Sequence, residues 1–189
     1  MLTPTIARNY TSGVESLSQE AELIVRGQAG SETCGQAALF TTDAASFLAS
    51  DALQAEVFGA SSLIVRCADA AEMHAVARGI EGQLTATVHA DDSDVAAAGA
   101  LLPLLELKAG RILFNGWPTG VEVCHAMVHG GPFPATSDSR TTSVGSRAIE
   151  RFLRPVCYQN VPTSLLPSAI ADGNPDKLWR RIDGQLRQD

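Results

Sequence analysis

The sequence has 189 residues, 45% of them hydrophobic and 19% charged, so a well-buried domain is expected and disorder of the bulk is not. The formal net charge of -7 disfavours anionic partners, so neither nucleic acid nor a membrane surface is expected to bind. No run of about 18 apolar residues is present, so no membrane span is expected.

The cysteines show no spacing typical of metal or redox sites. There are four of them without a CxxC pair, and no signal peptide is recognisable ahead of them. Reduced thiols in the cytoplasm are therefore the expected state. Cys34 lies in a loop rich in Gly, Ser and Thr, where a thiolate would be exposed, and is the candidate nucleophile by position alone.

Short apolar runs alternate with segments of helical periodicity as far as residue 116. Asp43 and Asp69 stand where helix N-caps are needed. The expected strands are 21–27, 38–42, 61–67, 84–90 and 111–116, and the expected helices are 5–18, 43–55, 70–82 and about 91–108. This order, with near-continuous apolar strands, predicts an α/β fold in which a mostly parallel sheet is covered by helices on both faces.

A long run rich in glycine and proline, 111–160, follows the last of these helices. Loops of this length inside a domain are usually functional, because glycine and proline fix backbone paths that other residues do not follow. A helix is expected at 143–155 and an isolated last strand at 156–159. The run is therefore the first place to look for a binding site.

The tail holds three prolines before Lys177 and is expected to form short helices, one of them amphipathic at 176–187. No clear boundary precedes residue 160. The predicted organisation is a main domain at 1–160 and a tail at 161–189.

Two histidines in the long run have the spacing of a metal-binding helix. Glu122, His125 and His129 form the pattern E-x-x-H-x-x-x-H, which would place both imidazoles on one helix face, as in zinc hydrolases. Gly-Gly-Pro follows His129 at once and would break such a helix, and no glutamate stands between the histidines. No metal ligand is predicted. The imidazoles either donate to a substrate carboxylate or have a purely structural role, and both interpretations stay open.

Three motifs, in the same order, resemble the aldehyde dehydrogenase superfamily. They are AEVFGASS at 55–62, RILFNGWPTG at 111–120 and HGGPFPATSDSRTTSVGSRAIERFLRPV at 129–156. The segment GVEVCHAMVHGGPFPATSDSRTTSVG is most similar to the sequences of the branch that acts on 2-oxoglutarate semialdehyde with NADP. The resemblance covers residues 1 to 165 and implies the C-terminal part of the family's chain, with most of its catalytic domain.

The resemblance also implies binding residues. Glu56 and Phe58 match the family residues that contact the nicotinamide ribose and ring of NADP or NAD, since a carboxylate accepts both ribose hydroxyls and an aromatic edge steadies the ring. The family has proline where Ala60 stands. Asn115 is implied to lie near the substrate pocket. Arg140 either binds the distal carboxylate of a dicarboxylic semialdehyde or belongs to a loop whose hydroxyls satisfy its own backbone.

The family's nucleophilic cysteine, in a Gly-Gln-x-Cys context, and its general-base glutamate lie upstream of the helix that opens this chain. The context of Cys34, GSETCGQ, does not match. No catalytic residue is therefore predicted, and no turnover by the chain alone. The implied parent enzyme oxidises a small-molecule aldehyde to an acid. Implied partners are a second copy or a full-length subunit. The alternative is a non-catalytic interaction module that pairs through a sheet edge and the strand 155–160.

Overall fold

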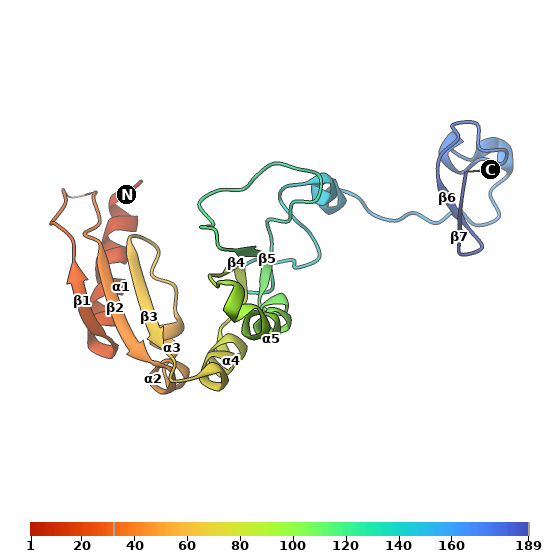
Figure 1. Ribbon diagram of the computed structural model, residues 1–189. Coiled ribbons are helices and arrows are strands. Elements are labelled where there is room, and N and C mark those ends of the chain that lie inside the picture. The colour runs from red at the N-terminus through yellow and green to blue at the C-terminus, as the bar shows by residue number, and fades with distance from the viewer. Residues whose placement is uncertain (32, 189) are drawn as a thin grey trace. The chain divides into compact units, whose positions relative to one another are not determined.

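The computed structural model describes residues 1–31 and 33–188 and divides the chain into two units, Met1–Arg151 and Phe152–Asp189. Both units are drawn in Figure 1. The organisation predicted from the sequence, with its division after residue 160, stays a prediction.

Helix α1 (Pro4–Glu20) begins at a well-formed cap. The Thr3 side chain accepts the Ile6 backbone N–H at 3.2 Å, and Pro4 suits the first turn because its missing N–H has no partner there anyway. The predicted helix at 5–18 is confirmed. The buried face of α1 consists of Tyr10, Val14 and Leu17.

The first sheet contains β1 (Glu22–Arg26), β2 (Ala38–Asp43) and β3 (Ser61–Arg66), with β2 in the centre. Helix α1 lies against this sheet (Figure 1). Phe40 on β2 is fully buried and joins the apolar face of α1 in one core. Burial of apolar surface between helix and sheet is what stabilises this part of the chain.

Strand β1 differs from the parallel arrangement that the sequence predicts. It runs antiparallel to β2, whereas β2 and β3 are parallel. The reason is the length of the connection, because residues 27–37 are too few for the crossover that parallel strands require. The β2–β3 connection is longer and holds α2 (Ala44–Ala49) and α3 (Asp51–Gln54).

A second strand–helix–strand unit follows. Strands β4 (Gln83–Val88) and β5 (Ala109–Phe114) pair in parallel, and between them lie a short 3₁₀ turn, η1 (Asp92–Asp94), and α5 (Val95–Glu106). Helix α4 (Ala70–Gly79) precedes β4 and packs on α5. As predicted, Asp43 and Asp69 are N-caps; their side chains accept the backbone N–H groups of Ser46 and Glu72. The small core of this unit consists of Ala77, Val88, Ala98 and Leu105.

Regular structure is sparse after β5. The predicted helix at 143–155 is reduced to a 3₁₀ helix, η2 (Ser146–Phe152). The strand predicted at 156–159 is wrong, since these residues are extended and exposed and pair with no strand among the described residues. A strand is defined by its neighbour, and here the described chain supplies none.

The tail contains two short 3₁₀ helices, η3 (Thr163–Leu165) and η4 (Ser168–Ile170), and then a hairpin. The amphipathic helix predicted at 176–187 is wrong, because β6 (Arg180–Ile182) pairs antiparallel with β7 (Gln185–Arg187). The turn residues Asp183 and Gly184 both have positive φ, 49° and 80°. Asp-Gly is a strong signal for a two-residue hairpin, and it outweighs the helical spacing of the apolar side chains.

A single buried side chain organises the tail. Asn174 is 3% exposed, and its amide nitrogen donates to the carbonyl oxygens of Leu178 and Gln188, each at 2.9 Å. Its amide oxygen accepts the Leu178 N–H at 2.9 Å. Arg180 adds a contact to the carbonyl oxygen of Ala171 at 2.7 Å. The hairpin is therefore fastened to the turn before it by polar contacts.

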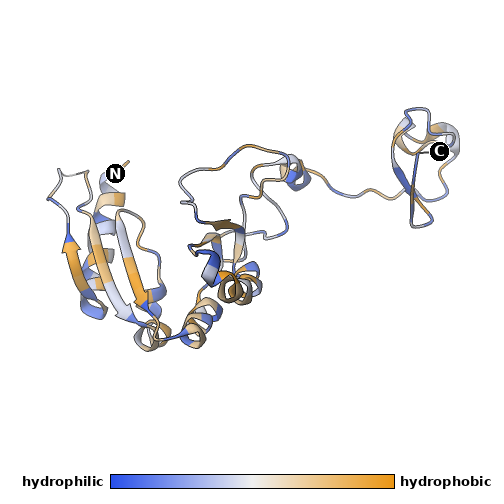
Figure 2. Cartoon of the chain, viewed as in Figure 1, coloured by the Kyte–Doolittle hydropathy of each residue, from blue (hydrophilic) through white to orange (hydrophobic). Residues whose placement is uncertain are grey.

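The mixed α/β class predicted from the sequence is confirmed, with the described strands divided among three sheets. No helix in the described part of the chain has both the length and the apolar character that a membrane crossing needs. Figure 2 shows the apolar residues concentrated in the strands and on the helices of the first unit.

Candidate functional site

The segment 55–60, between α3 and β3, is held on α1 by Tyr10. The buried Tyr10 hydroxyl lies 2.6 Å from the carbonyl oxygen of Gln36 and 3.1 Å from that of Ala60, so one O–H serves two loop carbonyls. Gly59 has a φ of 155°, and a Cβ there would overlap the Tyr10 ring. This contact fixes the start and direction of β3 and presents the residues just before it.

Glu56 and Phe58 lie together at this edge. Both line a cavity of about 500 Å³, whose other walls come from Leu17 on α1 and Leu63 on β3. Phe58 is 70% exposed, and the Glu56 carboxylate has no ion-pair or hydrogen-bond partner within residues 1–31 and 33–188. A free carboxylate next to an exposed ring is able to accept two hydroxyls and pack on a flat heterocycle. Of the predicted site residues, these two are the best placed to bind a ligand.

In contrast to Glu56, the Asn115 side chain is already hydrogen-bonded within the chain. It follows β5 with a φ of 52°, and its backbone N–H donates to the carbonyl oxygen of Val88 at 2.9 Å. Its side-chain amide forms a reciprocal pair with the backbone of Ala90, at 2.7 and 2.9 Å. Asn115 thus ties together the ends of the parallel strands β4 and β5, and both ends of its amide are in use.

His125 and His129 do not lie on a helix. The Nδ1 atom of His125 is 2.6 Å from the Ser146 hydroxyl, and the backbone N–H of His129 donates to the Thr142 hydroxyl at 2.8 Å. Residues 125–130 therefore run beside 141–146 and are joined to them at both ends. Gly145 permits this approach, since a Cβ there would overlap the carbonyl oxygen of Met127. The Nδ1 atom of His129 is buried and lacks a hydrogen-bond partner in the described chain.

The loop that carries the histidines rests on the beginnings of β4 and β5. A Cβ at Gly110 would overlap the carbonyl oxygen of Gly130, and one at Gly131 would overlap that of Gln83. Asn115 lies at the opposite ends of the same two strands. The register therefore separates Asn115 from the histidine loop by the length of the strand pair.

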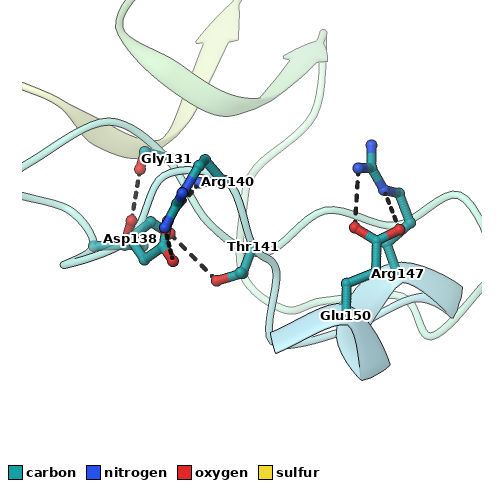
Figure 3. A network of polar contacts seen from close by, with 7 residues as sticks. Gly131, Asp138, Arg140, Thr141, Arg147 and Glu150 are labelled. Atoms are coloured by element: carbon teal, nitrogen blue, oxygen red, sulfur yellow. Dashed lines mark hydrogen bonds and ion pairs between the residues drawn. The ribbon is translucent and has the colours of Figure 1, made fainter. Parts of the chain in front are cut away.

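Arg140 is exposed, and its guanidinium is already paired. Its Nε and one terminal nitrogen donate to the two carboxylate oxygens of Asp138 at 3.0 and 3.1 Å (Figure 3). Hydrogen bonding from Arg140 lowers the pKa of the Asp138 carboxyl. A substrate carboxylate would have to displace Asp138 from this fork, in competition with a charge-assisted pair.

The described cavities do not unite the six predicted residues. Glu56 and Phe58 line two of these cavities together, whereas the lining residues of all five include none of Asn115, His125, His129 and Arg140. Among the described residues no three His, Cys, Asp or Glu side chains are grouped to hold a metal ion. Of the six residues, Glu56 and Phe58 are the pair that the described cavities bring together.

Sequence reasoning missed a largely apolar cavity of about 570 Å³ beside β5, whose lining includes the polar side chains of Arg111, Glu122 and Cys124. Arg111 donates to the carbonyl oxygen of Gly120 at 2.8 Å, and its Nε is buried without a hydrogen-bond partner in the described residues. The signal was available, because an arginine within an apolar strand needs a polar neighbour.

No family model matches the chain. Over 188 residues it is 52% identical to alpha-ketoglutaric semialdehyde dehydrogenase 2 of Azospirillum brasilense, covering 98% of this chain and 36% of the relative. It is 51% identical over 193 residues to the alpha-ketoglutaric semialdehyde dehydrogenase of Acinetobacter baylyi, covering 100% of this chain and 36% of that protein. The chain thus spans about a third of the length of these relatives.

Solved structures share the fold at lower identity. HpcC of Thermus thermophilus matches with a TM-score of 0.63 at 20% identity, over 85% of this chain and 32% of that one. A putative methylmalonate-semialdehyde dehydrogenase of Sinorhizobium meliloti, complexed with NAD, matches with a TM-score of 0.62 at 21% identity, over 82% and 31%. The sequence and structure matches agree: nearly the whole chain is similar to one part of semialdehyde dehydrogenases, and it shares the fold of that part of the aldehyde dehydrogenase family.

Proposed function

We propose that this chain supplies part of the binding surface of an NAD(P)-dependent aldehyde dehydrogenase that oxidises a carboxylated aldehyde, such as 2-oxoglutarate semialdehyde, to the acid. The observation that carries this proposal is the edge formed by Glu56 and Phe58, in a chain 52% identical to a semialdehyde dehydrogenase over 98% of its length. The reaction and its substrate belong to the whole protein.

Glu56 and Phe58 fit a nicotinamide nucleotide by the chemistry of their groups. The Glu56 carboxylate would accept the two ribose hydroxyls, and the Phe58 ring would support the nicotinamide ring at the cavity edge. When bound, the nucleotide supplies the hydride acceptor of the oxidation. Whether NADP or NAD is used depends on contacts outside this edge, and NADP is the proposal because the resemblance favours that branch.

On the substrate side, we propose that His125, His129 and Arg140 contribute to the binding of the carboxylate in the parent enzyme, and that Asn115, held at the opposite ends of β4 and β5, contributes to a separate part of the substrate pocket. Support comes from residue type, since imidazole N–H groups and a guanidinium donate to carboxylates. Arg140 would do so after exchanging Asp138 for the substrate. Asn115 would act indirectly, by holding the segments that follow β4 and β5 together through its pair with Ala90.

No residue of this chain is proposed as nucleophile or general base. The exposed Cys34 thiol has its pKa lowered by hydrogen bonding with Ser31, yet it lacks the Gly-Gln-x-Cys context and lines none of the cavities described above. In the parent reaction a cysteine thiolate adds to the aldehyde and a glutamate activates the water that releases the acid. We therefore propose that the chain does not turn over aldehyde by itself.

Association with a second chain belongs to the same proposal. Residues 155–159 are exposed and have no regular structure, which leaves them accessible for pairing with a sheet edge of a second copy or of a full-length subunit; Asn160, with a φ of 56°, ends this segment. All four cysteines are free thiols, in keeping with a cytoplasmic location. If the chain binds no nucleotide in any context, this association would be its function, as a non-catalytic interaction module.

The test uses the purified chain and nicotinamide nucleotides. Binding of NADP and NAD is measured by calorimetry, together with aldehyde turnover by the chain alone and after mixing with a full-length relative. We expect weak nucleotide binding that Glu56→Gln and Phe58→Ala reduce, and no turnover by the chain alone. As a control, Glu15→Gln on the exposed side of α1 should leave binding unchanged. Turnover by the isolated chain would contradict the proposal, as would binding that ignores both substitutions.

A further inference from the structure

Strand β1 is an edge strand with an apolar centre, and no segment of the described chain covers it. It pairs with β2 on one side only, and all five of its residues are exposed. Leu23, Ile24 and Val25 are 43%, 49% and 55% exposed, which is unusual for three successive apolar residues. Figure 2 shows this strand in the colour of strongly hydrophobic residues. An edge of this kind is a template for another strand.

The ends of β1 carry opposite charges. Glu22 opens the strand and Arg26 closes it. Neither side chain has an ion-pair partner within residues 1–31 and 33–188. The sequence ELIVR is therefore complementary to itself when two copies run antiparallel, because each end meets the opposite charge. In a parallel pair like charges would lie side by side, which is unfavourable.

We propose that the outer edge of β1 binds β1 of a second copy of this chain, antiparallel, about a twofold axis at Ile24. Glu22 then faces Arg26 of the partner subunit, and Leu23 faces Val25 of the partner subunit. Three kinds of contact join the pair: a backbone ladder, apolar cross-strand contacts and two ion pairs. The contact is the same on both subunits, as a twofold interface requires.

The irregular register of β1 is compatible with this pairing. Ile24 has no opposite residue on β2, because the register shifts between Leu23 and Val25. A shift of this kind bends and twists a strand. Since the irregularity lies at the proposed axis, the backbone ladder would be interrupted at Ile24, and the pairing would rest on the residues on either side of it.

The other exposed edge of this sheet lacks the charge pattern. Strand β3 reads SSLIVR, with serines at the end where β1 has its glutamate. Two copies of β3 running antiparallel would place an arginine opposite a serine. Charge complementarity thus selects β1.

This pairing is separate from the association proposed for 155–160 and independent of aldehyde chemistry. The test measures the mass of the chain by sedimentation equilibrium over a range of concentrations. We expect a monomer–dimer equilibrium, with a dimer at twice the 19.9 kDa of one chain. Glu22→Arg and Arg26→Glu should each raise the dimer dissociation constant about tenfold, because each places like charges opposite each other twice.

The double variant Glu22→Arg/Arg26→Glu restores complementary charges and should return the dissociation constant to within about threefold of the starting value. Glu15→Arg, a matched charge reversal on the exposed side of α1, should leave it unchanged. Circular dichroism establishes that each variant is folded.

Three results would overturn the proposal: a monomer at every concentration, a dimer indifferent to Glu22→Arg, or a double variant as weak as the single ones. A dimer that ignores charge at β1 but is lost in Val156→Pro would support the association through 155–160 instead.

Discussion

The segment at 55–60 and the loop at 115–146 both carry predicted binding residues, but they hold them in opposite ways. In the first, contacts from Tyr10 and the backbone fix the segment, and the side chains of Glu56 and Phe58 are left unengaged. In the second, the polar groups of Asn115 and Arg140 are occupied by Ala90 and Asp138. A functional group that is positioned but unsatisfied is ready for a ligand, whereas a satisfied one must first break a contact.

The largest loss of stability is expected where the loop that carries His125 and His129 packs on β4 and β5. Gly110→Ala places a methyl group against the carbonyl oxygen of Gly130, so we expect a loss of about 3 kcal/mol in the free energy of unfolding. Chemical denaturation measures it. The matched control is Gly99→Ala in α5, where a Cβ meets nothing within 4 Å. That variant should gain up to about 1 kcal/mol, because alanine is the better helix former. Equal effects at the two glycines would show that the loop does not rest there.

The Asn115 amide should matter for stability before it matters for substrate. Asn115→Ala removes both hydrogen bonds to Ala90 and strains the positive φ of 52°, at a cost of about 2 kcal/mol in unfolding free energy. Asn115→Gly relieves the backbone alone and should recover part of that loss. An unchanged denaturation midpoint for Asn115→Ala would mean that the amide is free to bind substrate.

Removing the Tyr10 hydroxyl should loosen the segment that carries Glu56 and Phe58. Tyr10→Phe removes a donor from the carbonyls of Gln36 and Ala60, of which Ala60 keeps the Ala38 N–H, so we expect a loss of about 1 kcal/mol and faster amide exchange over 55–60. Hydrogen exchange followed by mass spectrometry measures the latter. Tyr158→Phe, at an exposed tyrosine in the other unit, is the control and should change neither quantity.

The smallest expected effect is the contribution of the Asp138 carboxylate to stability at low pH. Its folded-state pKa is lowered by Arg140, so the stabilisation is present above the unfolded pKa of about 3.9 and is lost as the pH falls through the lower folded value. Carboxyl titration by NMR should give a higher Asp138 midpoint in Arg140→Gln than in the unsubstituted chain. Arg147→Gln, which removes the partner of Glu150, should leave the Asp138 midpoint unchanged. No shift in Arg140→Gln would mean that the fork is open to substrate in solution.

Much of the fold was readable because its determinants are local. Asp43 and Asp69 cap the helices that follow them within three residues, and Tyr10, Val14 and Leu17 mark one face of α1 by spacing alone. The hairpin at Asp183–Gly184 is equally local, but helical periodicity alone predicts a helix there, whereas the Asp-Gly turn decides for a hairpin. The Asp138–Arg140 pair, two residues apart, was also within reach of the sequence.

The sequence by itself determined the α/β class, the resemblance to aldehyde dehydrogenases and the residue types at the edge formed by Glu56 and Phe58. Only the tertiary structure decided which polar groups are still free, because their partners are distant in the chain: Ala90 lies 25 residues from Asn115, and Ala60 lies 50 residues from Tyr10. It also decided that 156–159 forms no strand while β1 presents an open edge. Capping and periodicity act over one helical turn, whereas strand pairing and hydrogen-bond satisfaction depend on which segments the fold brings side by side.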